Sequence, residues 1–308
     1  MKHILAIDGG GIRGIIPAIV CRAIENWSGS RICELFDLLA GTSTGGILAL
    51  GFSVPPDGID AKKLVEIYEL YGPKIFGGPR HFFNRLRRPK YSTKGLEEVL
   101  SMYFGETRLS QAIVEVLVTS YDIERRRPRV LKRWRAQSDH TQDCLMKEAG
   151  RATSAAPTYF SPARVGERAV VDGGIFSNNP ATLALAEAKR LWPGEEILLV
   201  SLGTGSLEQP ILFQDAQDWG LVRWGVPILD CVFDGVSDST HYALQYLLSA
   251  KTYVRFQCKL GEASEQIDDV SPRNIVALKK IGEDLVNDKR HEISQLVTTL
   301  VRPRHPGS

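Results

Sequence analysis

The sequence has 308 residues, 43% of them hydrophobic and 24% charged, which are ordinary proportions for a globular protein. Its net charge of +2 at pH 7 gives no overall attraction to a DNA or RNA duplex. No stretch approaches the roughly 20 apolar residues that cross a bilayer. We therefore expect a single domain over residues 1–308 that touches a membrane only from its surface.

The five cysteines are scattered and form no C-x-x-C pair, which indicates reduced thiols rather than a disulfide framework or a zinc site. The apolar run after Met1 ends at Asp8, too early for the apolar core of a signal peptide. Both features favour a cytoplasmic protein. No acidic residues cluster with histidine at ligand spacing, so we expect neither a metal nor a cofactor.

Apolar patterning predicts strands that alternate with helices. The expected strands are 4–7, 35–40, 114–120, 169–172, 197–202 and 253–257, and the expected helices are 15–27, 44–52, 61–71, 181–191 and 274–300. Asn179 and Pro180 are expected to cap and open the fourth helix. Such alternation is typical of an α/β fold with a mostly parallel sheet covered on both faces.

A serine turn follows the second expected strand. Residues 41–45 read G-x-S-x-G, the sharp strand-to-helix turn that exposes a nucleophilic serine, here Ser43. Gly41 and Gly45 leave room for the turn, and the next helix points its N-terminus toward developing negative charge. The alternative is a glycine-rich turn with an idle serine.

A glycine-rich loop follows the first expected strand. Gly9, Gly10 and Gly11 can direct their amides at one point, which suits an oxyanion hole or a phosphate cradle. The loop also fits the dinucleotide pattern G-x-G-x-x-G, but the second strand ends without the acidic residue that would bind the ribose. A phosphate-loop enzyme that binds ATP at Asp8–Gly11 stays open as an alternative.

A third turn, Asp172-Gly173-Gly174, follows the strand at 169–172. The aspartate either caps its own turn or serves as a base. The chain order permits a Ser43, Asp172, His241 triad, but only one strand precedes the strand that leads into the serine turn, fewer than in α/β-hydrolases. None of the six histidines lies in a glycine-rich turn. The remaining interpretation makes Asp172 the direct base of Ser43.

Together and in this order, the three turns resemble those of the patatin-like phospholipase family, over roughly residues 3–205. The resemblance implies a three-layer α/β/α patatin-like fold, a Ser43 nucleophile and an Asp172 base. It implies an oxyanion hole made or held by Gly9, Gly10, Gly11, Arg13 and Gly14. Gly41, Gly45, Gly173 and Gly174 would support the turns.

The resemblance also implies a substrate and partners. The substrate would be a membrane phospholipid whose acyl ester is cleaved at the inner membrane surface, with transfer of the acyl group to another alcohol as the alternative. Some bacterial members are antiphage effectors, and on that analogy a cyclic dinucleotide is a candidate activator. A non-catalytic lipid- or nucleotide-binding module and an oligomer also stay open.

Three further segments are left with open interpretations. Residues 80–90 and 125–135 are rich in arginine and lysine with interspersed aromatic residues. They suit solvated loops and a hairpin, docking on anionic lipid, or binding of an anionic regulator. Residues 219–248 are apolar enough for ordinary core, which we expect, or for a lid over the acyl site.

Overall fold

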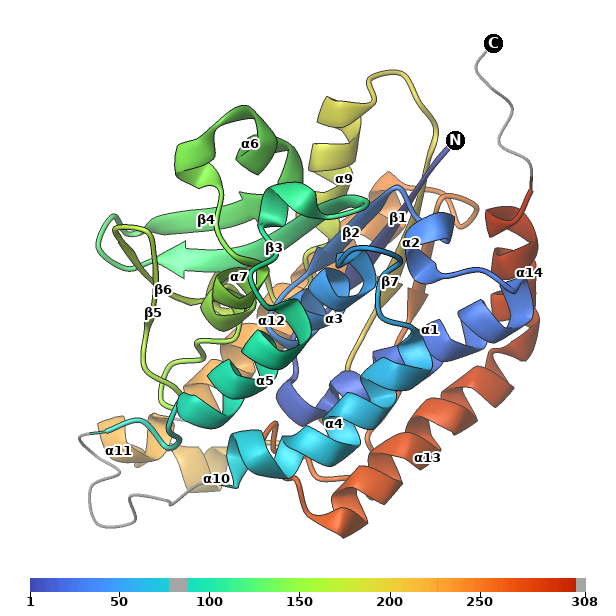
Figure 1. Cartoon of the computed structure of the whole chain (residues 1–308). Coiled ribbons are helices and arrows are strands. Elements are labelled where there is room, and N and C mark those ends of the chain that lie inside the picture. The colour runs from blue at the N-terminus through green and yellow to red at the C-terminus, as the bar shows by residue number, and fades with distance from the viewer. Residues whose placement is uncertain (78–87, 226, 303–308) are drawn as a thin grey trace.

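The computed structural model describes residues 1–77, 88–225 and 227–302. Within these residues eight strands form one sheet with helices on both faces (Figure 1). The strands are β1 (Lys2–Ile7), β2 (Leu38–Gly41), β3 (Glu115–Asp122), β4 (Arg127–Lys132), β5 (Ala163–Val165), β6 (Arg168–Asp172), β7 (Ile197–Leu202) and β8 (Tyr253–Phe256).

The longer helices are α1 (Ile15–Ser28), α3 (Thr44–Ser53), α4 (Ala61–Phe76), α5 (Lys94–Phe104), α7 (Met146–Thr153), α9 (Ala181–Leu191), α12 (Pro227–Leu247), α13 (Pro272–Asp288) and α14 (Arg290–Leu300). The shorter ones are η1 (Gly11–Gly14), α2 (Ile32–Leu35), η3 (Leu109–Gln111), α6 (Arg133–Ser138), η4 (His140–Gln142), α8 (Gly174–Ser177), α10 (Phe213–Ala216) and α11 (Leu221–Trp224). Among the described residues, none of these helices combines the length and the apolar character needed to cross a bilayer.

The strand order is β5-β6-β3-β2-β1-β7-β8, and β4 pairs with the free side of β3. The five strands from β3 to β8 in this order run parallel to one another. β4 and β6 run antiparallel to β3, and β5 runs antiparallel to β6. The predicted α/β class with a mostly parallel sheet is confirmed.

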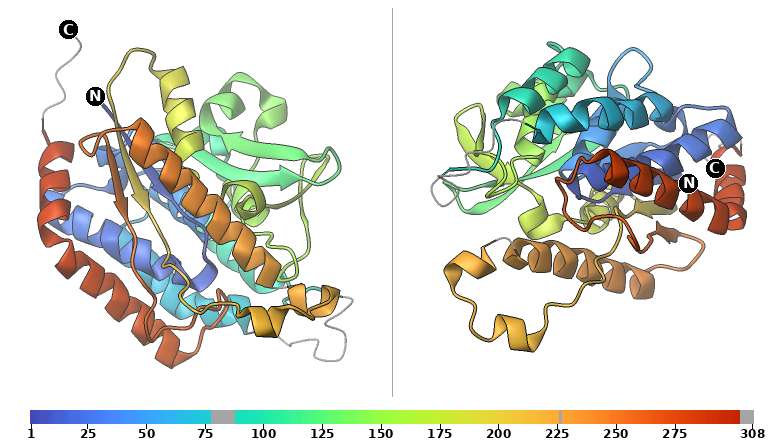
Figure 2. Two further views of the ribbon diagram at one scale, coloured as in Figure 1. Left: turned by 180° about the vertical axis from the view of Figure 1, so that it is seen from behind. Right: turned by 90° about the horizontal axis from the view of Figure 1, so that it is seen from below.

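Alternate side chains of each strand pack into two separate apolar cores. On β1, Leu5 and Ile7 join the larger core, whereas Ile4 and Ala6 join the smaller one. The larger core includes side chains of α1, α3, α4, α13 and α14, and the smaller one packs against α9 and α12. Figure 2 shows α12 and α13 on opposite sides of the sheet, so the three layers are helix, sheet and helix. This alternation follows from the two-residue side-chain period of a strand.

Several element boundaries differ from the sequence prediction. The expected helix at 274–300 is two helices, α13 and α14, separated at Lys289, whose backbone leaves helical geometry. α4 continues past Tyr71 to Phe76, with Pro73 inside it. Leu35 ends the short helix α2 and does not begin β2.

Residues 219–248 are not ordinary core, so that expectation is wrong. Leu221 is 94% exposed and Val222 is 76% exposed. On the long helix α12 only Ser237 and Leu244 are fully buried. α10 and α11 project from the body of the molecule at the end where the carboxyl end of β1 lies (Figure 1).

Candidate active site

Strand register brings the three glycine-rich turns to one level of the sheet. Ile7 on β1 and Val118 on β3 both lie opposite Gly41 on β2. Two residues further along, Ser43 therefore reaches the level of Gly9 and of Ser120. Ser120 in turn pairs with Asp172 on the antiparallel strand β6.

Ser43 lies at the tip of a strained turn between β2 and α3. Its backbone has φ 54° and ψ −120°, a conformation that non-glycine residues rarely adopt. The turn can close because Gly41 and Gly45 have no side chains: a Cβ on Gly41 would lie 2.1 Å from the Gly45 oxygen. The Ser43 amide donates to Thr153 Oγ1 at 2.8 Å. This geometry presents the Ser43 hydroxyl in front of the N-terminus of α3.

Asp172 is buried beside this serine, with 1% of its surface exposed. Burial raises the pKa of Asp172 to about 7, although hydrogen bonds with the Ser43 side chain and the Gly174 amide lower it. The Gly174 amide lies 2.8 Å from Asp172 Oδ1. The carboxyl thus caps its own turn and also lies beside Ser43. The turn-capping and the catalytic interpretation of Asp172 are therefore compatible.

The glycine-rich loop passes directly beside Ser43. A Cβ on Gly9 would lie 3.3 Å from the Ser43 Cβ. The Gly9 amide donates to the Asn178 carbonyl, and the Ile12 amide donates to the Ile267 carbonyl. Within the described residues, the amides of Gly10 and Gly11 have no protein acceptor. Of the three glycine amides predicted to bind an oxyanion, only those of Gly10 and Gly11 are therefore available. Two amides are few for a loop that would bind phosphate groups.

Gly11 requires glycine for two reasons. Its φ is +58°, and a Cβ there would lie 2.1 Å from the Ile267 oxygen. The other predicted site glycines also lie against neighbouring atoms: Gly10 against Thr204, Gly14 against Thr44, Gly45 against Ile7, Gly173 against Thr119 and Gly174 against Phe233.

Arg13 is 5% exposed and folds back on the loop. Its Nε donates to the Gly10 oxygen at 3.3 Å. Its Nη1 is buried and has no hydrogen-bond partner in the described part of the chain. Burial lowers the pKa of Arg13, and the carboxylates of Asp234 and Asp230 partly offset this effect.

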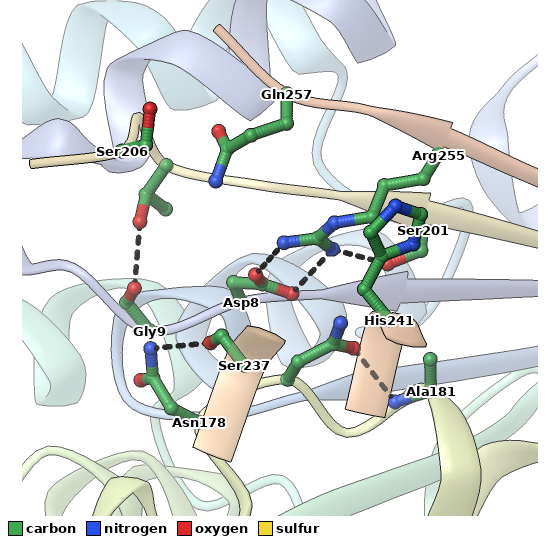
Figure 3. Close-up of polar contacts among 12 residues, drawn as sticks. Asp8, Gly9, Asn178, Ala181, Ser201, Ser206, Ser237, His241, Arg255 and Gln257 are labelled. Carbon is green, nitrogen blue, oxygen red and sulfur yellow. Dashed lines mark hydrogen bonds and ion pairs between the residues drawn. The ribbon is translucent and has the colours of Figure 1, made fainter. Parts of the chain in front are cut away.

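A buried ion pair anchors the start of the loop, and sequence reasoning missed it. Arg255 on β8 donates to Asp8 Oδ2 at 2.7 Å and to Ser201 Oγ at 2.6 Å (Figure 3). Burial lowers the pKa of Arg255, but attraction to Asp8 outweighs it and raises that pKa. The only sequence signal was a cation inside an otherwise apolar strand.

Two further contacts hold the loop from the same side of the sheet. The Thr204 hydroxyl donates to the Gly9 carbonyl at 2.7 Å. Asn178 Nδ2 donates to Ser237 on α12 at 3.1 Å (Figure 3). The loop is therefore held by the turn after β7 and by Asn178 after α8, and α12 in turn holds Asn178.

His241 lies with this second group of residues. Its Nδ1 is 3.0 Å from the Tyr253 hydroxyl, and its ring lies near Arg255 (Figure 3). Burial lowers the pKa of His241, and the charge of Arg255 adds to that shift. Its hydrogen-bond partner is thus a tyrosine of β8.

An apolar cavity of about 90 Å³ adjoins the serine. Ser43, Thr44 and Gly11 form one part of its wall. Side chains of α4 and α5 form much of the rest: Leu64, Ile67, Tyr68, Ile75, Phe76, Leu96, Val99 and Leu100. An apolar group attached to an atom bound at Ser43 can extend into this space.

Residues 125–128 of the basic segment 125–135 are exposed, whereas Lys132, Arg133 and Trp134 make internal contacts. Lys132 pairs with Glu187, and Arg133 pairs with Glu115. The guanidinium of Arg190 lies 3.6 Å from the Trp134 ring centre and covers one face of that ring. These contacts favour a structural role for the segment. The other basic segment falls largely on residues 78–87, outside the described residues.

All five cysteines are free. No group of three or more His, Cys, Asp or Glu side chains within the described ranges is arranged to hold a metal ion.

Comparisons with known proteins agree on one family. Residues 5–185 match the family model described as patatin-like phospholipase. Patatin-T5 and Patatin-04/09 of Solanum tuberosum are each 32% identical over 327 residues, covering 93% of this chain and 84% of theirs. Probable inactive patatin-3-Kuras 1 of the same plant is also 32% identical, covering 95% and 89%.

Among solved structures, VipD from Legionella pneumophila is similar with a TM-score of 0.47 and 13% identity. The match covers 93% of this chain and 67% of that chain.

Fold and comparisons together define a lipid acyl hydrolase, a serine esterase of the phospholipase type. The family model covers more than half of the sequence, and the plant relatives keep about a third of their residues in common with it over almost its whole length. The chain belongs to the patatin-like phospholipase family. One relative of equal identity carries "inactive" in its name, so the catalytic assignment depends on the residues of the site.

Proposed function

We propose that this protein, as a single domain, cleaves acyl esters of membrane phospholipids with Ser43 as nucleophile and Asp172 as base. The Ser43 oxygen forms a bond to the acyl carbonyl carbon while its proton passes to Asp172. The amides of Gly10 and Gly11 donate to the resulting oxyanion. Asp172 then returns the proton to the leaving alcohol, and water hydrolyses the acyl-enzyme with Asp172 again as base.

One observation carries this proposal: a serine in a strained strand-to-helix turn lies beside a buried carboxyl, and burial raises the pKa of that carboxyl to about 7. A base with a pKa close to neutral can both accept and return a proton at physiological pH. The adjoining apolar cavity supports an acyl chain as the group that is bound.

The same residues would also serve transfer of the acyl group to an alcohol other than water. Incubation with phosphatidylcholine vesicles, with and without added glycerol, separates the two reactions by their products. We expect free fatty acid and lysophospholipid, with loss of roughly 10⁴-fold or more of the activity in Ser43→Ala. Acylglycerol as the main product would instead establish the acyltransferase. Unchanged turnover in Ser43→Ala would refute the nucleophile.

Contact with the bilayer is assigned to the projecting segment around α10 and α11. Phe213 is 81% exposed, and Leu221 and Val222 are the other strongly exposed apolar side chains there. Trp219 and Trp224 stack edge to face within the same segment. Exposed apolar side chains with tryptophans suit the interfacial region of a membrane. The protein thus acts as a peripheral enzyme at the inner membrane surface.

Activation by a cyclic dinucleotide stays a prediction from the family resemblance, as does a role in antiphage defence. Three of the arginines that motivated it, Arg80, Arg85 and Arg87, lie outside the described residues. Titration of the purified protein with cyclic dinucleotides during phospholipid turnover tests it directly.

A further inference from the structure

The segment between β8 and α13 contacts the glycine-rich loop at Ile267. The Ile267 carbonyl accepts the Ile12 amide at 2.9 Å. The same oxygen would lie 2.1 Å from a Cβ on Gly11. Ile267 thus touches two successive residues of the loop, and the amide of one of them, Gly11, is a proposed oxyanion donor. The position of the Ile267 carbonyl therefore limits where the Gly11 backbone can lie.

The next residue, Asp268, has a firmly anchored side chain that is 3% exposed. Its Oδ2 accepts the Tyr91 hydroxyl at 2.5 Å and pairs with the Lys90 ammonium. The Tyr91 ring packs against Phe76 and Phe160, with ring centres 5.5 and 5.9 Å away. A packed aromatic hydroxyl and a cation thus fix the carboxylate, from a segment about 177 residues away along the chain.

A planar peptide unit joins the Ile267 carbonyl to the Asp268 nitrogen and Cα. The chain is also held on the far side of Asp268, because Asn274 Nδ2 donates to the Asp269 carbonyl at 2.7 Å. Asn274 is itself buried. A turn of the Ile267 carbonyl away from Ile12 therefore has to move Asp268 away from its anchors.

We propose that Asp268 is a positioning residue of the reaction, which through the Ile267 carbonyl keeps the Gly11 amide directed at the oxyanion. The inference rests on the proposed function. An oxyanion donor acts mainly in the transition state, where the charge develops, so its displacement lowers kcat and leaves KM unchanged. Removal of one such donor costs about 10²–10³-fold in kcat, and a donor that is only displaced should cost about tenfold.

Kinetics of Asp268→Ala with p-nitrophenyl butyrate test the inference. We expect kcat to fall about tenfold while KM stays within about twofold of wild type. Propyl trifluoromethyl ketone adds to a catalytic serine as an oxyanion with the same acyl chain, so its inhibition constant should rise by the same factor. A higher KM with unchanged kcat, or unchanged binding of the ketone, overturns the inference.

Asp143→Ala is the matched control. The Asp143 side chain is 4% exposed, pairs with Arg108 and accepts the Ser110 hydroxyl at 2.8 Å, so it is anchored in the same way as Asp268. Neither partner belongs to the described wall of the apolar cavity. Both variants should lose a similar amount of stability in urea unfolding, but Asp143→Ala should keep the wild-type kcat. Equal losses of kcat in the two variants would reduce Asp268 to a structural residue.

Tyr91→Phe is a milder variant, because it keeps the packed ring and removes only the hydroxyl that Asp268 accepts. We expect kcat to fall about threefold, as fits the loss of one hydrogen bond. Added to Asp268→Ala it should cause no further loss, because the carboxylate through which it acts is already absent. Additive losses of kcat would contradict the inference.

Failure of the proposed function gives a different result. In that case wild type does not hydrolyse p-nitrophenyl butyrate, whereas failure of the inference leaves wild-type turnover intact.

Discussion

At the residue scale, the proposed base Asp172 is expected to set the pH dependence of the reaction. An ordinary aspartate is ionised above about pH 4, but burial raises the pKa of Asp172 to about 7. Only the ionised form accepts the Ser43 proton, so activity should rise with pH through a midpoint near 7. The measurement is kcat/KM for a soluble ester between pH 5 and 9, with circular dichroism to show that the fold persists. A midpoint near pH 4, or a flat profile, would contradict this role.

Substitution of Gly11 tests the role of the oxyanion loop, and Gly29 provides a matched control glycine. Both Gly11 and Gly29 have positive φ, but a Cβ on Gly29 meets no atom within 4 Å. Gly29→Ala should therefore cost only the backbone strain, about 1–2 kcal/mol of unfolding free energy. Gly11→Ala adds a clash with the Ile267 oxygen and displaces an amide that we assign to the oxyanion. We expect a larger loss of stability and at least about a hundredfold loss of kcat.

Denaturant unfolding and esterase kinetics of the two variants make this comparison. Equal effects on stability and activity would show that Gly11 has no special place in the loop.

At the element scale, the ion pair between Asp8, directly after β1, and Arg255 of β8 stabilises the loop. The side chains of Arg255 and Asp8 are 6% and 3% exposed. Arg255→Met leaves the Asp8 charge buried and alone, so we expect a loss of about 3–5 kcal/mol in unfolding free energy. Arg22→Met breaks the exposed pair with Glu283 and should cost no more than about 1 kcal/mol.

Urea unfolding measures these free energies, with Asp8→Asn as the second single variant of the ion pair. The double variant Asp8→Asn/Arg255→Met should recover part of the loss, because no unpaired charge remains. A double variant as unstable as the sum of both single changes would contradict the ion-pair account.

The sequence predicts some elements better than others for physical reasons. β1, β2 and β7 are buried apolar runs that lead into glycine-rich turns, so pattern alone locates them. β4 was considered only as part of a possible hairpin, without strand bounds, because it is rich in arginine and lysine and its first residues are exposed. The break between α13 and α14 was missed because the apolar period continues across Lys289.

The residues of the candidate site also differ in how well the sequence predicts them. Ser43 and Asp172 can be proposed from the sequence because each lies in a short motif with its own local signal. Arg255 was missed because its partner Asp8 lies 247 residues away along the chain, and no local pattern records such a contact. The amide of Gly9 was assigned to the oxyanion although a carbonyl near α8 already accepts it. Motifs therefore suggest candidate reactive side chains, whereas the fold decides which backbone groups remain available.

At the scale of the whole molecule, the projecting apolar segment should govern turnover on membranes. Phe213→Ser/Leu221→Ser removes two exposed apolar side chains from it. Each contributes up to about 2 kcal/mol on insertion, so vesicle binding should fall at least about tenfold. Val276→Ser is the control, because Val276 is 67% exposed on α13, across the sheet. Vesicle sedimentation is the measurement, and equal binding of both variants would contradict the assignment.

Covalent labelling of the nucleophile is the most direct test of the account. The purified protein is treated with a fluorophosphonate probe and the adduct is located by peptide mass spectrometry, alongside Ser43→Ala, Asp172→Asn and the exposed-serine control Ser101→Ala. The account predicts a single adduct on Ser43, its complete loss in Ser43→Ala, much slower labelling in Asp172→Asn and full labelling in Ser101→Ala. An adduct on any other residue, or wild-type protein that does not react, would contradict it.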